Sequence, residues 1–271
     1  MRGILKHDLY SGFCQYRGKF LLGILFFSLI GIGANLEAES YQLRHLSMLE
    51  MVGYLFAGVM PFQEERSNAA DFQIPIIWMI LQIYIAYIVG AYPLQDLKSY
   101  GVNLLLRTRD RGKWWLGKVI WVVMINIVVY VIEVIVFTVI AVAEHSGGIF
   151  GIQQGIGQLC HVELEQLSGY ELISLLFLLP FFTSVSISML QLFFMFWVNE
   201  MAAYAVILFL CVAGAYYKSP FFLTNNSMLV RNITYLENGL WMIPAGVLLG
   251  VGVCACVGGN YVMKHKDIFE N

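Results

Sequence analysis

The sequence contains few charged residues. Only 13% of its 271 residues are Asp, Glu, Lys or Arg, whereas 59% are hydrophobic. Soluble globular domains carry roughly 25% charged residues, which cover much of their surface. A chain with so little charge cannot present a polar surface on all sides, so we expect it to fold within a lipid bilayer. An all-α fold is expected, because a helix in hydrocarbon satisfies its own backbone hydrogen bonds.

Motifs for common enzyme chemistry are also missing. No GxxxxGK[ST] phosphate-binding loop occurs, because Gly112 and Lys113 are followed by Trp114, and GxSxG and HExxH are absent. The five cysteines form no CxxC pair, so neither a disulfide framework nor a metal site is expected. We therefore expect no catalytic residue, no metal and no cofactor in this chain, and no nucleic-acid partner.

Six hydrophobic segments are candidates for membrane-spanning helices of a single transmembrane domain over 1–271. A bilayer core about 30 Å thick requires about 20 mainly apolar residues. The predicted spans are 19–36, 75–95, 118–143, 172–197, 201–217 and 241–263, of which the fifth is short. A further apolar stretch, 46–62, carries Glu50 and is interpreted as interfacial or re-entrant. If it spanned instead, the two termini would lie on opposite sides.

The distribution of basic residues predicts the orientation. Lys and Arg accumulate in short cytoplasmic loops. With six spans and a cytoplasmic N-terminus, 12 of the 16 basic residues lie inside. The four outside are Arg44, Arg66, Lys218 and Arg231. Both termini are therefore expected on the cytoplasmic side of a bacterial cytoplasmic membrane.

The positive charge is densest between the second and third spans, where residues 104–121 read LLLRTRDRGKWWLGKVIW. Five basic residues fall within twelve positions: Arg107, Arg109, Arg111, Lys113 and Lys118. One interpretation is topological, because such residues meet anionic lipid at about 1 kcal/mol per charge. The alternative is a docking site for a soluble subunit.

The residues before this cluster favour docking. Residues 94–106 read LQDLKSYGVNLLL, which is typical of a short amphipathic helix. Leu97, Tyr100 and Leu104 offer apolar contacts, and Asp96 joins the arginines in offering charged ones. The N-terminal residues 1–18 also have apolar positions at helical spacing, which predicts a helix in the membrane plane. An ordinary flank of the first span is the alternative.

Together these features resemble the membrane subunits of ABC-2-type transporters. The resemblance rests on the basic segment around Trp114 and Trp115, the amphipathic N-terminus and the basic tail YVMKHKDIF. It covers the whole chain in topology, although the first outer loop, 37–74, is longer than the commonest pattern. The resemblance implies a permease that pairs with a second copy or a homologous permease. It also implies a separate ATPase subunit, which holds ATP and Mg and docks on a coupling helix over 94–111.

The implied function is export of an amphipathic or hydrophobic molecule, such as a lantibiotic or a drug. Two rival interpretations remain: a membrane sensor without transport, and a secondary transporter that uses Glu133. A charged residue at mid-bilayer costs roughly 2.5–3.5 kcal/mol. Glu133, in the third span, is therefore interpreted either as part of the transport pathway or as a hydrogen-bonded link between helices.

Other intramembrane residues are candidates for the pathway or for packing. Ser184, Ser188 and Gln191 follow Pro180 at helical spacing and share one face. They either line the pathway or bond their own backbone near a proline kink. Gly246 and Gly250 form a GxxxG motif, continued by Gly252, Ala255, Gly258 and Gly259, which predicts close helix packing within the bundle.

Overall fold

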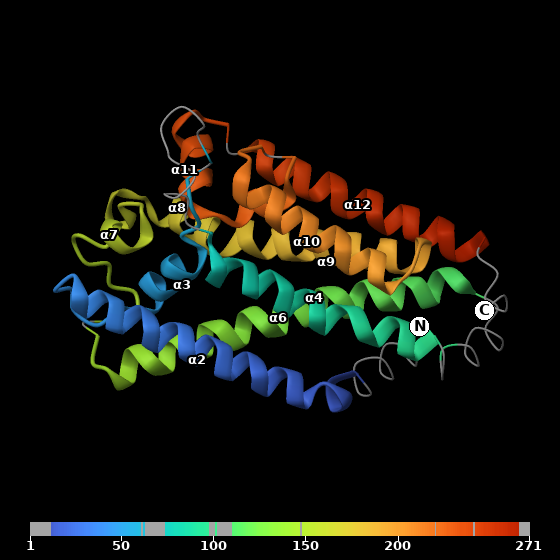
Figure 1. Cartoon of the computed structure of the whole chain (residues 1–271), viewed down its shortest axis with the longest axis horizontal. Coiled ribbons are helices and arrows are strands. Elements are labelled where there is room, and N and C mark those ends of the chain that lie inside the picture. Colours follow the sequence, from blue (N-terminus) through green and yellow to red (C-terminus); the bar gives the residue numbers. More distant parts are fainter. Residues whose placement is uncertain are drawn as a thin grey trace.

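The computed structural model describes residues 12–60, 62, 74–97, 101, 110–146, 148–219, 221–240 and 242–265. Every regular element in these residues is a helix, and they contain no strand (Figure 1). The predicted all-α class is therefore confirmed for the described chain. The helix predicted over 1–18 lies mostly outside these residues. Only residues 12–15 are described as helical, and the chain turns at Tyr16 into the first long helix.

Among the described residues, five helices are long and apolar enough to cross a membrane. They are α2 (Arg17–Ser40), α4 (Ile76–Asp96), α6 (Arg111–Ala143), the continuous helix Gly169–Trp197, and α12 (Met242–His265). The shortest, α4, has 21 residues and a length of about 32 Å, enough for a hydrocarbon core of about 30 Å. The remaining predicted span forms α10 (Glu200–Tyr216), whose 17 residues extend about 26 Å. The fold is thus compatible with a multi-pass membrane protein.

The helix α9 (Leu179–Trp197) lies at the centre of the bundle. It packs against α4, α6, α10 and α12, whereas α2 packs mainly on α6 (Figure 1). Large apolar side chains on the outward faces remain exposed, including Leu29, Val139 and Val253. Apolar surface of this extent is unusual in soluble monomers and suits contact with lipid.

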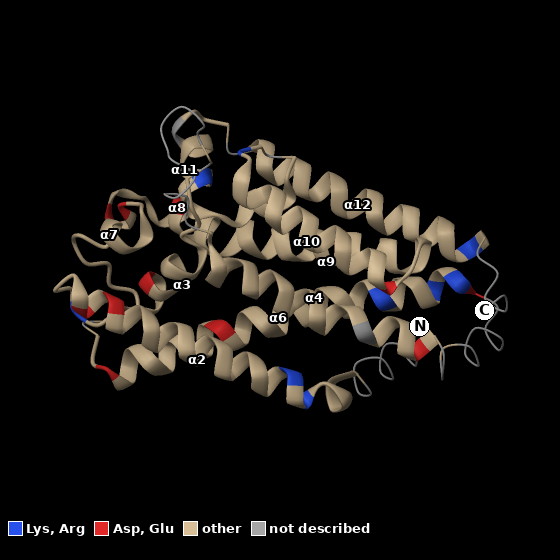
Figure 2. Cartoon of the chain, in the orientation of Figure 1, with Lys and Arg blue, Asp and Glu red and all other residues tan. Residues whose placement is uncertain are grey.

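Charged residues separate toward opposite ends of the bundle (Figure 2). Basic residues gather where α2 and α6 begin and where α12 ends. Acidic residues gather near the last turn of α2 and around α3 (Met48–Phe56) and α7 (Gly157–Cys160). We call these the basic end and the acidic end.

The start of α6 explains part of this charge distribution. The helix begins at Arg111, before the predicted third span, because Asp110 caps it. The Asp110 carboxylate accepts the backbone N–H of Lys113 at 3.1 Å, and the Lys113 ammonium lies 2.7 Å from it. The hydrogen bond from the Lys113 side chain has the largest effect in lowering the pKa of Asp110, and the bond from the Lys113 backbone N–H lowers it further. Lys113 and Lys118 therefore belong to the helix and not to the loop before it.

The ambiguous segment 46–62 does not form a span of its own. Its helix, α3, has nine residues and a length of about 14 Å, which is less than half of a hydrocarbon core. Ser47 and Glu50 form a capping box at its start, and most of its residues are buried. Gly58 follows with a φ of +72° and packs against the side chain of Met228, a position that excludes a larger residue. The helix of this segment is therefore too short to cross a bilayer core by itself.

The helix that contains α9 begins irregularly. It consists of α8 (Gly169–Ile173), the π-helical turn η4 (Ser174–Leu178) and α9. Pro180 has no N–H to donate to the carbonyl of Leu176, so the regular ladder cannot pass through this turn. The distortion predicted at Pro180 is therefore present as a π turn directly before it.

The loop after α10 folds back into the bundle at the acidic end. All five residues of η5 (Leu223–Ser227) are buried. The Thr224 hydroxyl donates to the Leu210 carbonyl at 2.8 Å, and the Trp78 indole donates to the Ser227 hydroxyl at 2.8 Å. The short helix η3 (Leu164–Gln166) lies in the other long loop of this end. The irregular backbone of η5 is thus surrounded by protein, where its polar groups find partners.

Arg231, on α11 (Leu229–Glu237), donates hydrogen bonds to the last carbonyls of α10. Its side chain is buried and donates to the carbonyls of Gly214, Ala215 and Tyr217. Burial lowers the pKa of Arg231 to about 10, so the group remains charged at neutral pH. The last carbonyls of a helix carry partial negative charge and attract a cation. One arginine therefore ties the end of α10 to the loop that follows it.

Candidate functional site

A buried ion pair joins α4 and α6 at the basic end. The Lys118 ammonium lies 2.6 Å from Asp96 Oδ2, and the two side chains are 0% and 5% exposed. The Trp114 indole N–H donates to the same oxygen at 3.2 Å. The ammonium also lies 4.7 Å from the ring centre of Tyr92, which adds a cation–π contact. Removing one partner of such a pair costs about 3–5 kcal/mol, because the other charge is left buried without compensation.

The same end of α6 is fastened to α12. Arg111 Nη1 donates to the carbonyls of Met263 and Lys264 at 3.3 Å and 3.2 Å, in the last turn of α12. One turn further on, the Trp115 indole donates to the carbonyl of Cys256 at 2.9 Å. The chain between α4 and α6 is therefore held at both ends by contacts to three helices. A displacement of this chain would be passed to α4, α6 and α12 together.

The residues predicted to dock an ATPase differ in their burial and in their contacts with the bundle. Asp96 was expected to offer its charge to a partner, and the structure corrects this, because the carboxylate is buried against Lys118. Leu97 is half-buried and packs on the core, and Arg111 contacts α12. Tyr100, Leu104, Arg107 and Arg109 lie outside the described residues.

Lys118 was not recognised from the sequence as a site residue. It was counted with the basic residues that determine orientation, whereas the structure makes it one of the largest fully buried side chains. One signal was available. Lys118 stands four residues after Trp114, so both side chains share a face of the helix and can reach a common polar partner.

A polar layer lies between α6 and α9 in the middle of the bundle. Asn126 Nδ2 donates to the Ser188 hydroxyl at 3.2 Å, and the hydroxyls of Tyr130 and Ser184 are 2.9 Å apart. Gln191 Nε2 donates to the carbonyl of Ala86 on α4 at 2.9 Å. The three predicted residues of α9 therefore bond neighbouring helices and not their own backbone. Asn126 and Tyr130 were missed, although both precede Glu133 on the same face, seven and three residues earlier.

Glu133 lies at one end of this layer. Its side chain is 1% exposed, and neither carboxylate oxygen has a hydrogen-bond partner among the described residues. The hydrogen-bonded link between helices is therefore not seen in the described chain. Gln82 and Thr183 are likewise buried without side-chain partners in this part of the structure. Buried polar atoms are costly when unpaired, so this layer is suited to accept water or the polar group of a ligand.

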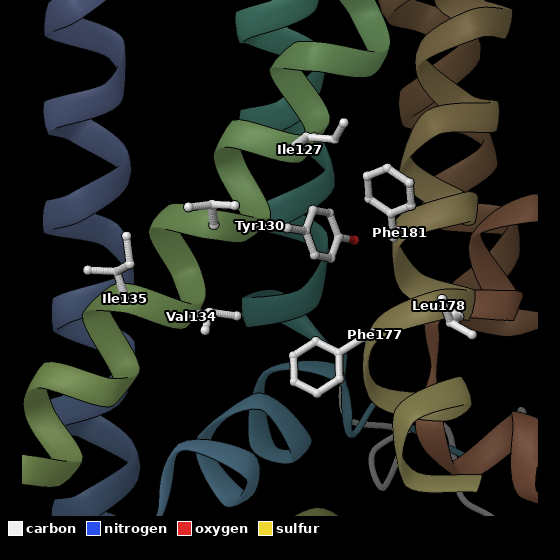
Figure 3. Close-up of a pocket in the computed structure, with 8 residues that line it drawn as sticks. Ile127, Tyr130, Val134, Ile135, Phe177, Leu178 and Phe181 are labelled. Carbon is white, nitrogen blue, oxygen red and sulfur yellow. The ribbon is translucent and has the colours of Figure 1, made fainter. Parts of the chain in front are cut away.

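An apolar groove runs beside the polar layer (Figure 3). It has a volume of about 360 Å³ and lies between α6 and the η4–α9 helix. Tyr130 separates the two features: its ring packs on Phe181 with centroids 5.5 Å apart, while its hydroxyl reaches Ser184. Figure 3 shows Tyr130 pointing toward Phe181 across the groove, with Phe177 and Leu178 on the facing helix. An amphipathic molecule could thus contact the apolar groove and the polar layer together, because the Tyr130 side chain lies between them.

The glycines of α12 divide differently from the prediction. Gly246 and Gly250 are exposed, and a Cβ on either would meet nothing within 4 Å. The expected packing of these two within the bundle is therefore wrong for the described chain. The close approach occurs nearer the basic end. There Gly259 contacts the Trp115 ring, and a Cβ on Gly258 would lie 3.2 Å from the Phe193 ring. The helix turns its GxxxG face outward because Leu248 and Ala255 face inward.

No protein-family model, curated protein or solved structure matches this chain. The class of the protein therefore rests on its fold: the part of the chain that the structure describes is all-helical, with five helices apolar and long enough to cross a membrane.

Proposed function

We propose that the chain is the transmembrane subunit of an ATP-driven ABC-2-type exporter. It would move an amphipathic or hydrophobic molecule, such as a lantibiotic or a drug, out across the bacterial cytoplasmic membrane. ATP and Mg would be held by a separate ATPase subunit. The observation that carries the proposal is that the helix ends on either side of residues 97–110 are joined. The buried Asp96–Lys118 pair links α4 to α6, and partly buried hydrogen bonds from Arg111 and Trp115 link α6 to α12.

The proposal takes α10 as a sixth span and the basic end as cytoplasmic. The separation of charge along the bundle supports this orientation, because basic residues favour the cytoplasmic side. The short length of α10 is compensated by η5, which is buried against it at the acidic end. Both termini would then be cytoplasmic, and 1–18 would lie in the membrane plane.

The coupling step follows from the contacts at the basic end. An ATPase would bind residues 97–110, including Arg107 and Arg109. Its movement would displace the ends of α4 and α6 as one unit, because the Asp96–Lys118 pair joins them. Both helices pack on α9, which carries the pathway candidates Ser184, Ser188 and Gln191. A second permease copy, or a homologous permease, would enclose the groove that is open on one chain.

Glu133 favours a second candidate function, a secondary transporter. Its two unpaired oxygens could bind a coupled ion or proton. A secondary transporter needs no ATPase, so vesicles that contain this chain alone would show transport. The substitution Glu133→Gln would abolish that transport. If the chain is the subunit of an exporter, vesicles that contain this chain alone would transport nothing, with Glu133 or after Glu133→Gln.

Affinity purification from native membranes tests the exporter directly. The exporter predicts an associated chain that is photolabelled by 8-azido-ATP, with ATPase activity in the eluate. The double substitution Arg107→Glu with Arg109→Glu should remove both signals, while Arg44→Glu, an exposed arginine at the acidic end, should leave them intact. Recovery of the folded chain without any labelled partner would refute the proposal.

A further inference from the structure

A second cavity lies at the acidic end, separate from the polar layer. It has a volume of about 490 Å³ and is enclosed by the η4 turn, α11 and the first turn of α12. Its apolar wall includes Leu175, Phe182 and Pro244. This volume falls within the range of about 300–1,000 Å³ that is typical of small-molecule sites. The π turn η4 forms part of the wall, and such turns are frequent at functional sites.

Asn232 lines this cavity and is buried. Its side chain is 2% exposed, and its Nδ2 donates to the carbonyl of Asn226 at 2.7 Å. The other amide atom, Oδ1, has no hydrogen-bond partner in the described part of the chain. Most buried polar atoms are hydrogen-bonded, so an acceptor left free beside a cavity indicates a missing donor. Arg231, its neighbour, is already committed to the carbonyls of α10.

Glu171 adds negative charge at the rim. One carboxylate oxygen, Oε2, accepts the backbone N–H and the hydroxyl of Ser168 at 2.7 Å and 2.8 Å. Among the described residues that line the cavity, Glu171 is the only charged one. The lining therefore combines an apolar wall, a neutral acceptor and a carboxylate, with no described cation to balance the charge.

We propose that this cavity binds an apolar molecule that carries a protonated amine. The ammonium would donate to Asn232 Oδ1 and approach the Glu171 carboxylate, while the apolar body would lie against Leu175 and Phe182. A primary amine of this kind occurs in amphipathic drugs and peptides and in the ethanolamine headgroup of phospholipids. The proposal concerns binding alone, so it does not depend on an ATPase or on transport.

Photolabelling of the full chain in nanodiscs of phosphatidylcholine and phosphatidylglycerol tests the site. The probe is a primary alkylamine with a diazirine in its chain, and the labelled peptides are mapped by mass spectrometry. Labels are expected on η4 and α11, and decylamine should compete for them whereas decanoate, of equal length and opposite charge, should not. Competition by phosphatidylethanolamine as well would identify lipid as a source of the ligand, and its absence would leave soluble amines; both results support the site.

Two substitutions and a control sharpen the test. Asn232→Leu and Glu171→Gln should each weaken competition by decylamine about tenfold, the effect of losing one hydrogen bond to a charged group. Asn238→Leu, at the residue that directly follows the same helix and lies outside the lining, should have no effect. If Asn232→Leu does not fold, the partly exposed Glu171 still provides a variant that keeps the interior intact. Equal competition by decanoate, or competition unchanged in folded Glu171→Gln protein, would overturn the proposal.

Discussion

The buried ion pair between Asp96 and Lys118 makes a strong prediction about stability. Lys118→Met leaves the Asp96 carboxylate buried beside the Trp114 indole N–H, without the ammonium that balances its charge. The expected loss of stability is about 3–5 kcal/mol. Asp96→Asn keeps an acceptor for the indole and leaves the ammonium over the aromatic rings of Tyr92 and Trp114. A cation–π contact offsets about 0.5–2 kcal/mol, so this loss should be smaller, about 2–3 kcal/mol.

The double substitution separates the pair from its surroundings. With Asp96→Asn and Lys118→Met combined, no charge is left buried, and the total loss should fall to about 1 kcal/mol. The two single substitutions would then be coupled by about 4 kcal/mol or more. Denaturant unfolding of the purified chain in detergent measures each corner of this cycle.

A second ion pair at the same end provides the control. Lys113 and Asp110 lie 2.7 Å apart but are exposed, so water screens their interaction. Lys113→Met, Asp110→Asn and their combination should change stability far less and without measurable coupling. If the Asp96 and Lys118 variants are additive, or if each is as mild as the exposed pair, the reasoning about a buried anchor is wrong.

Three further predictions test other contacts. Arg231→Met should destabilise the chain by about 3 kcal/mol in the same unfolding assay, since the carbonyls at the end of α10 lose a charged donor; a cost under 1 kcal/mol would contradict this. Gly259→Leu should cost about 1–3 kcal/mol or prevent folding because an indole occupies the space, whereas Gly250→Leu should be neutral. In a cysteine-free chain, Ser99→Cys should resist impermeant thiol reagents added to sealed cells; rapid labelling would reverse the proposed orientation.

The helical class and most of the long apolar helices could be predicted from the sequence. Hydrophobic length and the placement of Lys and Arg are properties of continuous segments, and the bilayer acts on them segment by segment. For this reason the helices around Phe27, Val89 and Leu248 were found without knowledge of their neighbours. The boundary of α6 was less accurate, because Asp110 caps the helix through a hydrogen bond that hydrophobicity does not reveal.

Tertiary packing decided which polar residues matter to one another. Lys118 reads as a surface cation until Asp96, on another helix, is brought within 2.6 Å. Ser188 reads as a hydroxyl near a proline until Asn126 faces it. Such pairs join residues 22 or 62 positions apart, and no local spacing encodes which faces of two helices will meet. In the same way Gly259, and not Gly250, packs closely, because the rotation of α12 depends on the side chains of α6 and α9 that it must accommodate.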